Sequence, residues 1–326
     1  MTIEEAARYL SGRDNFIIVS HDGPDADGLG AAYALALSLE SIGKRAVPAV
    51  SDRLPLKFAF IDRRGIIVSL AEPGSLPFPA SQASPIIVDT HDMGYLGERS
   101  ASLVAAAERA LTIDHHELKS HSKNELLLDP TASSTCEIVF YLAKVLGASL
   151  PLDAAEAIFA GLVYDTGSFA YPKTSERTFA CAFELVKAGV LPYEVHKRMY
   201  ESSPSGILLL EKAVISSLEL ALDGRIAFLK LTKEDLAASE ASYEDAEDLV
   251  NIPLQDRKVE VSVLFKENSE GRLRCSLRSK GAVNVAHIAQ AFGGGGHKTA
   301  AGFTCADQLA RVKVDVLQSI AAALPS

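Results

Sequence analysis

Short runs of apolar residues alternate with helix-like patterns through the first half of the chain. Residues 16–20, 86–89 and 111–114 are continuous apolar runs of strand length. Residues 31–41 predict a helix rich in small side chains, and residues 152–164 predict another. Continuous apolar strands that alternate with helices are typical of a parallel sheet covered on both faces. We therefore expect an α/β fold that begins with a doubly wound, mainly parallel sheet.

The second half of the chain has a different pattern. Residues 174–220 are helical with glycine and proline breaks, and strand-like runs return beyond Gly224. A last helical pattern covers 309–323, with Asp307 as its expected cap. The other expected elements are strands at 226–231, 259–265, 273–277 and before Thr304, and a helix at 283–292. We therefore expect a second, smaller α/β domain and divide the chain into residues 1–188, a helical connector at 189–220, and residues 221–326.

Composition and charge limit the classes of function. The chain has 326 residues, of which 48% are apolar, so it can build a large core, and its formal net charge is −10. The acidic balance argues against binding of long duplex nucleic acid, which needs a basic track. It does not exclude a short anionic ligand, because bound metal ions would supply local positive charge.

The sequence also gives an expected compartment. Its four cysteines are scattered without a C-x-x-C spacing, which is typical of ordinary thiols in a reducing cytosol. The first residues lack the basic and apolar regions of a signal peptide, and no apolar run is long enough to span a bilayer. We expect a cytoplasmic protein without membrane contact.

Acidic and imidazole side chains gather where the expected strands end. The segment from His21 to Asp27 follows the first strand, Asp89 ends the second, and Asp114 ends the third and precedes two histidines. A helix also ends at Asp165. In parallel sheets, ligands bind beyond the carboxyl ends of the strands. We therefore expect these side chains to meet in one region.

Such a cluster indicates a pair of divalent metal ions. Crowded carboxylates and imidazoles repel or compete unless a cation lies between them, and hard divalent cations prefer oxygen ligands, with imidazole also accepted by manganese. Taken alone, Asp27 would be interpreted as a helix N-cap. Six such residues at several strand ends favour a metal site instead. The candidate ligands are His21, Asp25, Asp27, Asp89, His115 and Asp165. We expect a hydrolase that acts on phosphate esters.

A run of four glycines, 293–296, precedes His297 and Lys298. Without Cβ atoms, the N–H groups of Gly294, Gly295 and Gly296 would be open to a phosphate or a base. The alternative is a turn that ends a helix, for which one glycine is enough. Four in a row favour a ligand site.

These residues resemble the motifs of a known superfamily. The segments His21-x-x-x-Asp25-x-Asp27, Asp89 after 86–88, Asp114-His115-His116 and Asp165-Thr166-Gly167 resemble those of DHH phosphoesterases. Residues 293–302 (GGGGHKTAAG) resemble the signature of the DHHA1 domain. The length, and residues 275–279 (CSLRS), are similar to those of the NrnA type of bifunctional oligoribonuclease and pAp phosphatase. The motifs run from residue 21 to 302, so the resemblance covers nearly the whole chain.

The resemblance implies a role for each matching residue. Residues 1–188 would be the DHH catalytic domain and 221–326 the substrate-binding DHHA1 domain. Two Mn²⁺ ions, with Mg²⁺ or Co²⁺ as substitutes, would lie in the DHH domain. The first ion would be held by His21, Asp25 and Asp89, and the second by Asp27, Asp89, His115 and Asp165, with Asp89 as the bridge. His116 would contact the scissile phosphate and assist the leaving group, Asp114 would orient a histidine, and Arg278, Ser279 and His297 would bind substrate.

The sequence leaves several alternatives open. The substrates implied are short single-stranded RNA, dinucleotides and pAp, but the same site could hydrolyse c-di-AMP or linear pApA. A non-catalytic nucleotide sensor is the alternative from another class, although all six ligand positions are filled. The small-residue helix over 31–39 is interpreted as core, and a homodimer contact is the alternative. His91, where the family usually has a small or uncharged residue, is either an extra substrate or metal contact or a partly exposed loop histidine.

Overall fold

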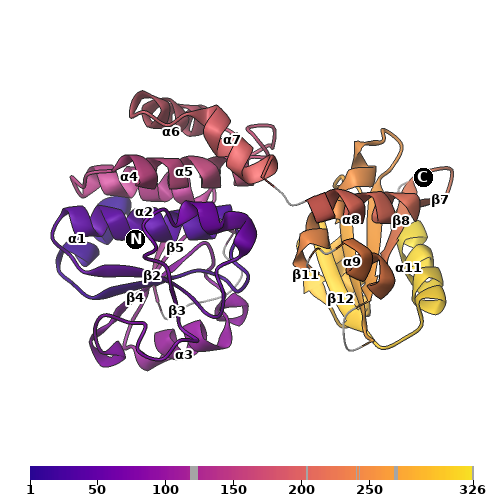
Figure 1. Cartoon of the computed structure of the whole chain (residues 1–326), viewed down its shortest axis with the longest axis horizontal. Coiled ribbons are helices and arrows are strands. Elements are labelled where there is room, and N and C mark those ends of the chain that lie inside the picture. Colours follow the sequence, from indigo (N-terminus) through magenta and orange to yellow (C-terminus); the bar gives the residue numbers. More distant parts are fainter. Residues whose placement is uncertain (118–123, 203–204, 240, 242, 268–270, 325–326) are drawn as a thin grey trace. The chain divides into compact units, whose positions relative to one another are not determined.

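The structure, a computed structural model, divides the chain into two compact units, residues 1–202 and 203–326 (Figure 1). The segment 189–220 that the sequence predicts as a connector spans this division. The residues that the structure describes are 1–117, 124–202, 205–239, 241, 243–267 and 271–324.

The first unit is built on a parallel sheet, as the apolar runs predict. Its six strands within the described residues have the order β3-β2-β1-β4-β5-β6, and every neighbouring pair is parallel. The strands are β1 (Phe16–Val19), β2 (Ala46–Val50), β3 (Val68–Ser69), β4 (Ser84–Val88), β5 (Leu111–Asp114) and β6 (Glu125–Leu128).

Helices cover both faces of this sheet, which explains why the strands are continuously apolar (Figure 1). On one face, Phe16 and Ile18 of β1 pack against α2 and its neighbours, and on the other face Ile17 packs with Val104 of α3. The α-helices of the unit are α1 (Ile3–Ser11), α2 (Ala26–Ser41), α3 (Glu98–Ala106), α4 (Thr135–Val145), α5 (Leu152–Asp165), α6 (Glu176–Lys187) and α7 (Pro192–Tyr200). Short 3₁₀ turns lie at η1 (Leu56–Ile61), η2 (Ala80–Gln82) and η3 (Met93–Tyr95).

Helix α2 begins earlier than its apolar pattern predicts, at Ala26 rather than residue 31. Gly28 and Gly30 therefore lie inside the helix and do not form a turn. A Cβ on Gly28 would lie 2.2 Å from Oγ of Ser20, and one on Gly30 would lie 2.5 Å from the carbonyl oxygen of Ala157 in α5. The glycines let α2 approach β1 and α5 closely. Residues 26–39 of α2 are all buried, so this helix is core.

The second unit has a mixed sheet, with the order β11-β12-β10-β9-β8-β7 within the described residues. Among the strands that the structure describes there, only β8 and β9 run parallel. The strands are β7 (Glu219–Ala221), β8 (Ile226–Leu231), β9 (Val261–Glu267), β10 (Leu273–Ser279), β11 (Gly295–Gly296) and β12 (Ala300–Cys305). The helices are α8 (Ser205–Ser216), α9 (Lys233–Ser239), the 3₁₀ segment η4 (Glu244–Gln255), α10 (Val285–Ala291) and α11 (Leu309–Ala323).

Two separate apolar clusters cover the two faces of the second sheet. Helices α10 and α11 pack on one face, and α8 and η4 pack on the other. The last helix spans the expected residues, but its N-cap is Gln308 rather than Asp307, and no side chain caps it. None of the described helices is both long and apolar enough to cross a membrane.

Candidate metal centre

The first sheet brings the predicted chemistry to one edge. The strand order reverses between β1 and β4, and this topological switch point is where open parallel sheets bind ligands. His21 lies just beyond β1, Asp89 directly follows β4, and Asp114 is the last residue of β5. The three loops therefore deliver their side chains to one place, as the sequence predicts.

The first group of possible ligands consists of His21, Asp25 and Asp89, whose donor atoms all lie within 4.8 Å of one another. Nε2 of His21 lies 3.6 Å from Oδ2 of Asp89 and 3.9 Å from Oδ1 of Asp25. Asp25 is also the N-cap of α2, because its Oδ1 accepts hydrogen bonds from the N–H groups of Asp27 and Gly28. The sequence suggested Asp27 for this cap, so the capping role belongs to a different carboxylate.

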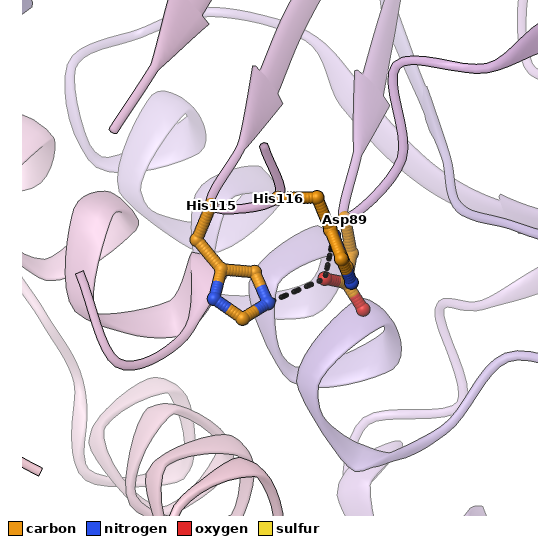
Figure 2. Close-up of side chains that lie close together, drawn as sticks. All are labelled: Asp89, His115 and His116. Carbon is orange, nitrogen blue, oxygen red and sulfur yellow. Dashed lines mark ion pairs between the residues drawn. The ribbon is translucent and has the colours of Figure 1, made fainter. Parts of the chain in front are cut away.

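The second group consists of Asp27, His115 and Asp165, again within 4.8 Å. Nε2 of His115 lies 3.0 Å from Oδ2 of Asp165 and 3.6 Å from Oδ1 of Asp89. Figure 2 shows the rings of His115 and His116 both directed at the carboxylate of Asp89. Asp89 thus faces one group through Oδ2 and the other through Oδ1, and we call it the shared carboxylate.

The backbone places the shared carboxylate at some cost. Asp89 has a φ of 65°, in the left-handed region that few residues other than glycine adopt. Such a conformation costs about 1–3 kcal/mol and persists where the surroundings determine it. Here the N–H of Asp89 donates to the carbonyl of Ile113, and its Oδ1 accepts from Oγ1 of Thr135 at 3.1 Å.

The N-terminus of α4 supports the centre, and the sequence analysis did not predict this. The N–H groups of Thr135 and Cys136 donate to the two carboxylate oxygens of Asp27, at 2.7 and 2.8 Å. Free N–H groups and the helix dipole favour an anion at this position. A local signal existed, because Ser134 followed three residues later by Glu137 is typical of a helix start. That signal does not indicate which carboxylate the N-terminus of the helix binds.

Lys173 is a second neighbour that the sequence analysis missed. It lies on the turn after α5, and its Nζ donates to the backbone carbonyl of His115 at 3.1 Å. An isolated lysine between Pro172 and Thr174 carries no sequence signal for such a contact.

Burial and, after it, repulsion between carboxylates raise the pKa values of the acids in the centre. Burial, followed by the nearby charge of Asp165, raises the pKa of Asp27 to about 6. The same causes raise the pKa of Asp25, and burial with the neighbouring carboxylates raises that of Asp89 well above its usual value. Buried like charges of this kind are relieved by a bound cation.

The donor set fits a pair of divalent cations. Nε2 of His115 is buried and makes no hydrogen bond to any described residue, while two carboxylate oxygens lie within 3.6 Å of it. Oxygen and imidazole donors in this proportion suit manganese, and oxygen donors suit magnesium. These residues can therefore hold two cations that share one carboxylate.

Asp114 lies behind this centre and is completely buried. Its Oδ1 accepts from Nδ1 of His116 at 2.7 Å, and its Oδ2 faces Nδ1 of His91 at 2.5 Å. Although burial raises the pKa of Asp114, hydrogen bonds from the two histidines lower it below its usual range. His91 itself is only 6% exposed, so the expectation of a partly exposed loop histidine is wrong.

In the second unit, the start of the glycine run ends helix α10, which is the alternative that the sequence left open. The N–H groups of Gly293 and Gly294 donate to carbonyls of α10, so they are not open to a ligand. A Cβ on Gly294 would lie 2.2 Å from the carbonyl oxygen of Gly302, and one on Gly296 would lie 2.5 Å from that of Ala300. Gly295 is different, because no atom lies within 4 Å of its Cβ position.

The other residues predicted to contact substrate lie close to the glycine run in the fold of the second unit. Ser279 ends β10, is 6% exposed, and its Oγ donates to the carbonyl of Val283. Arg278 precedes it and donates from Nη1 to the carbonyl of Leu277. The N–H of His297 donates to the carbonyl of Ala300, which closes the turn between β11 and β12. These residues therefore share the end of β10 and the β11–β12 hairpin.

Comparison with known proteins agrees with this architecture. The model of the DHH family N-terminal domain matches residues 15–164, and that of the DHHA1 domain matches residues 225–324. The bifunctional oligoribonuclease and PAP phosphatase NrnA of Thermus thermophilus is 28% identical over 293 residues, covering 88% of this chain and 83% of that protein. The protein of the same name from Bacillus subtilis is 28% identical over 303 residues, covering 91% of each chain.

A solved structure matches nearly the whole chain as well. It is that of an exopolyphosphatase-related protein from Bacteroides fragilis, with a TM-score of 0.89 and 26% identity, covering 97% of this chain and 94% of that one. The two family models together span most of both units. The chain therefore belongs to the DHH/DHHA1 family of phosphoesterases.

Proposed function

We propose that this chain is a manganese-dependent phosphoesterase that hydrolyses short oligoribonucleotides to mononucleotides and pAp to AMP. The names of the Thermus and Bacillus relatives support these substrates. The observation that carries the proposal is the pair of ligand groups joined by the shared carboxylate, Asp89. Two-metal phosphoesterases depend on such a pair.

His21, Asp25 and Asp89 would hold one ion, and Asp27, His115 and Asp165 the other, with Asp89 close enough to the second group to serve both. When bound, such cations supply an activated water and neutralise charge on the phosphoryl oxygens. The N-terminus of α4 keeps Asp27 in place through two N–H groups, which leaves the carboxylate less free to turn away.

His116 is the group that meets the scissile phosphate. Its side chain is 38% exposed, whereas Asp114 behind it is buried. Because an ionised carboxylate only accepts hydrogen bonds, Nδ1 of His116 carries the proton that it shares with Oδ1 of Asp114. Nε2 is the ring nitrogen through which we propose that His116 donates a proton to the departing oxygen when the ring is charged.

The second unit carries the other residues that we propose to bind substrate. Arg278 suits bidentate binding of a phosphate. Ser279 positions the turn after β10 through its hydrogen bond to the carbonyl of Val283, His297 adds a donor, and the space beside Cα of Gly295, where a Cβ would meet no atom within 4 Å, is open to a ligand. Gly294 and Gly296 shape the hairpin that presents these groups. The same chemistry suits a short single strand and offers no track for a long duplex.

One preparation tested on several substrates decides the function. The panel contains a labelled dinucleotide, a longer oligoribonucleotide, pAp, linear pApA and c-di-AMP, each with Mn²⁺, Mg²⁺ or Co²⁺. We expect Mn²⁺-dependent release of mononucleotides from the short oligomers, conversion of pAp, and loss of both in Asp89→Asn. Preferred hydrolysis of c-di-AMP or pApA would favour the cyclic-dinucleotide alternative, and tight binding without turnover would favour a nucleotide sensor.

We also propose that the protein acts in the cytoplasm. Cys136, Cys181 and Cys275 are free and buried, and Cys305 is free and half-buried. Free thiols are typical of a reducing cytoplasm, which is where short RNA fragments and pAp would be met.

A further inference from the structure

His91 has no part in the function proposed so far, yet the structure buries it behind the metal centre, against Asp114. It lies two residues beyond the shared carboxylate and is 6% exposed. Its Nδ1 lies 2.5 Å from Oδ2 of Asp114. Among the described residues, the groups that could hold a metal ion do not include it.

Asp114 joins two histidines through its two oxygens. Oδ1 accepts from the backbone N–H and from Nδ1 of His116, at 3.1 and 2.7 Å. Oδ2 faces Nδ1 of His91. Because the carboxylate can only accept, both imidazoles must present a protonated Nδ1 to it. The result is a chain of three side chains, His91–Asp114–His116, that runs from the core to the exposed ring.

We propose that His91 is a positioning residue for the reaction: it holds Oδ2 of Asp114, so that Oδ1 stays aimed at His116 and fixes the orientation of that ring. The torsion that turns a carboxylate is soft, so one anchored oxygen determines where the other points. The proposal rests on the proposed function only for the role of His116, because the contact itself can be tested without turnover.

Two substitutions separate this role from a simple packing role. His91→Leu removes the donor but keeps a similar volume, whereas His91→Asn retains an N–H donor close to the position of Nδ1. Supporting groups behind ligands are worth about 10–100-fold in activity. We expect His91→Leu to lower kcat by about that factor with KM changed less than about threefold, and His91→Asn to recover most of the loss.

A double-mutant cycle with His116→Ala tests whether His91 acts through His116. Residues that act as one unit are not additive. We expect His91→Leu to cost less than about twofold once His116 is absent, and Mn²⁺ affinity, measured by calorimetry, to stay unchanged. An equal loss of activity in both backgrounds would overturn the proposal, as would a fall in Mn²⁺ affinity as large as the fall in kcat, which would make His91 a ligand.

A measurement on the wild-type chain keeps the proposal testable if the variants fail to fold. Nitrogen-15 NMR of the histidine rings, recorded with Mg²⁺ in place of paramagnetic Mn²⁺, reports which ring nitrogen carries the proton. We expect Nδ1–H for both His91 and His116. An Nε2–H tautomer at either ring refutes the chain of contacts, whatever the enzyme hydrolyses.

A separate observation concerns the outer face of α6. Phe179 and Phe183 are 56% and 64% exposed on this helix, with exposed Ala180 between them. Glu176 and Lys187 are exposed at the two ends of the same face. The opposite face of α6 is buried in the first unit, so the helix is apolar on both sides, which is typical of a surface that meets a partner.

The outer face of α6 is complementary to itself when two copies run antiparallel. With a twofold axis beside the midpoint between residues 181 and 182, Glu176 lies opposite Lys187 of the second copy. The same symmetry sets small Ala180 opposite large Phe183. Opposite charges at both ends and a small residue facing a large one are the features of an isologous contact.

From this pattern we infer that the outer face of α6 is the contact between two copies of this chain. Sedimentation velocity of the full chain tests it with Glu176→Lys, Lys187→Glu, the double reversal, and Phe183→Glu. Leu56→Glu, at a residue 92% exposed in η1, is the matched control. We expect a wild-type dimer, weakening of about three- to tenfold by each single reversal, restoration by the double reversal, and a monomer for Phe183→Glu.

Three results overturn the inferred contact. They are a monomeric wild type, a dimer that Phe183→Glu leaves intact, and a double reversal that stays as weak as the single ones. Weakening by Leu56→Glu equal to that by Phe183→Glu also overturns it, because the effect would then not be specific to α6.

Discussion

Without bound metal, the folded state should become less stable as pH rises. Metal binding should have the opposite pH dependence, because the ligands must lose their protons to bind. The pKa of Asp27 is raised by burial and by Asp165, and those of Asp25 and Asp89 are raised as well. An acid with a raised pKa binds more protons in the folded state than in the unfolded state, so its contribution to folding stability falls as pH increases through that window.

The size of the effect follows from the pKa of Asp27. A change from 3.8 to about 6, at about 1.4 kcal/mol per unit, removes about 3 kcal/mol of folding free energy between about pH 4 and pH 6. Burial lowers the pKa of His115, but Asp165 and Asp27 raise it by more, so the pKa is raised overall. The contribution of His115 to folding stability therefore also falls as pH increases. The lowered pKa of Asp114 changes stability only below about pH 4, where this carboxyl takes up a proton in the unfolded chain but stays ionised in the folded one.

Urea denaturation of the chelator-treated chain across this pH range measures the effect. With saturating Mn²⁺ the slope should reverse, because the ligands must lose their protons to bind and affinity therefore rises with pH. The two stability curves should diverge toward neutral pH. A metal-free stability that stays constant or rises from about pH 5 to pH 7 would falsify the reasoning, since the carboxylates would then not be crowded in the absence of metal.

Three substitutions test the supports of the centre. Thr135→Val removes the hydroxyl that donates to the shared carboxylate and should weaken Mn²⁺ binding about 10-fold by calorimetry. The control is Thr112→Val, whose buried hydroxyl makes no hydrogen bond to a described residue; equal affinities of the two variants would contradict the support. Gly161→Ala places a Cβ against Sγ of Cys136 and 2.8 Å from Oδ1 of Asp27. The overpacking cost of about 1–3 kcal/mol should exceed the helix gain of about 0.5–1 kcal/mol, so a stabilised variant in urea would refute this close packing. Arg177→Met removes the cationic partner of the buried Glu137 carboxylate, 3.0 Å away. It should lower the free energy of unfolding by about 2 kcal/mol or more, less than the roughly 3–5 kcal/mol of a fully buried pair because Arg177 is 34% exposed. An unchanged unfolding midpoint would count against this expectation.

The sequence predicts the parallel sheet well because its signals are local. Strands buried on both faces must be apolar throughout, so the runs that form β1, β4 and β5 can be recognised in the sequence. The same locality places His21, Asp89 and Asp114 at strand ends. Topology alone then brings them together, since every carboxyl end of a parallel sheet lies at the same edge.

Helix starts and glycine roles are predicted less well because they depend on contacts distant in sequence. The first turn of α2 has no apolar stripe to reveal it, since it packs Gly28 against β1 rather than a large side chain. In the second unit, Gly294 and Gly296 are needed for close backbone approach in the β11–β12 hairpin. A glycine required for packing and a glycine required for ligand binding look alike in the sequence, and only the neighbouring backbone in the fold distinguishes them.

The supports of the metal centre could not be predicted for the same reason. Asp27 is bound by residues of α4 that follow it by 108 and 109 positions, and the shared carboxylate by one that follows by 46. The ligands are specified by strand order, but their orientation is specified by how α4 packs against α2. It follows that substitutions which shift α4 should alter metal affinity before they alter the fold, because two N–H groups and one hydroxyl hold the carboxylates, while the apolar core holds the helices.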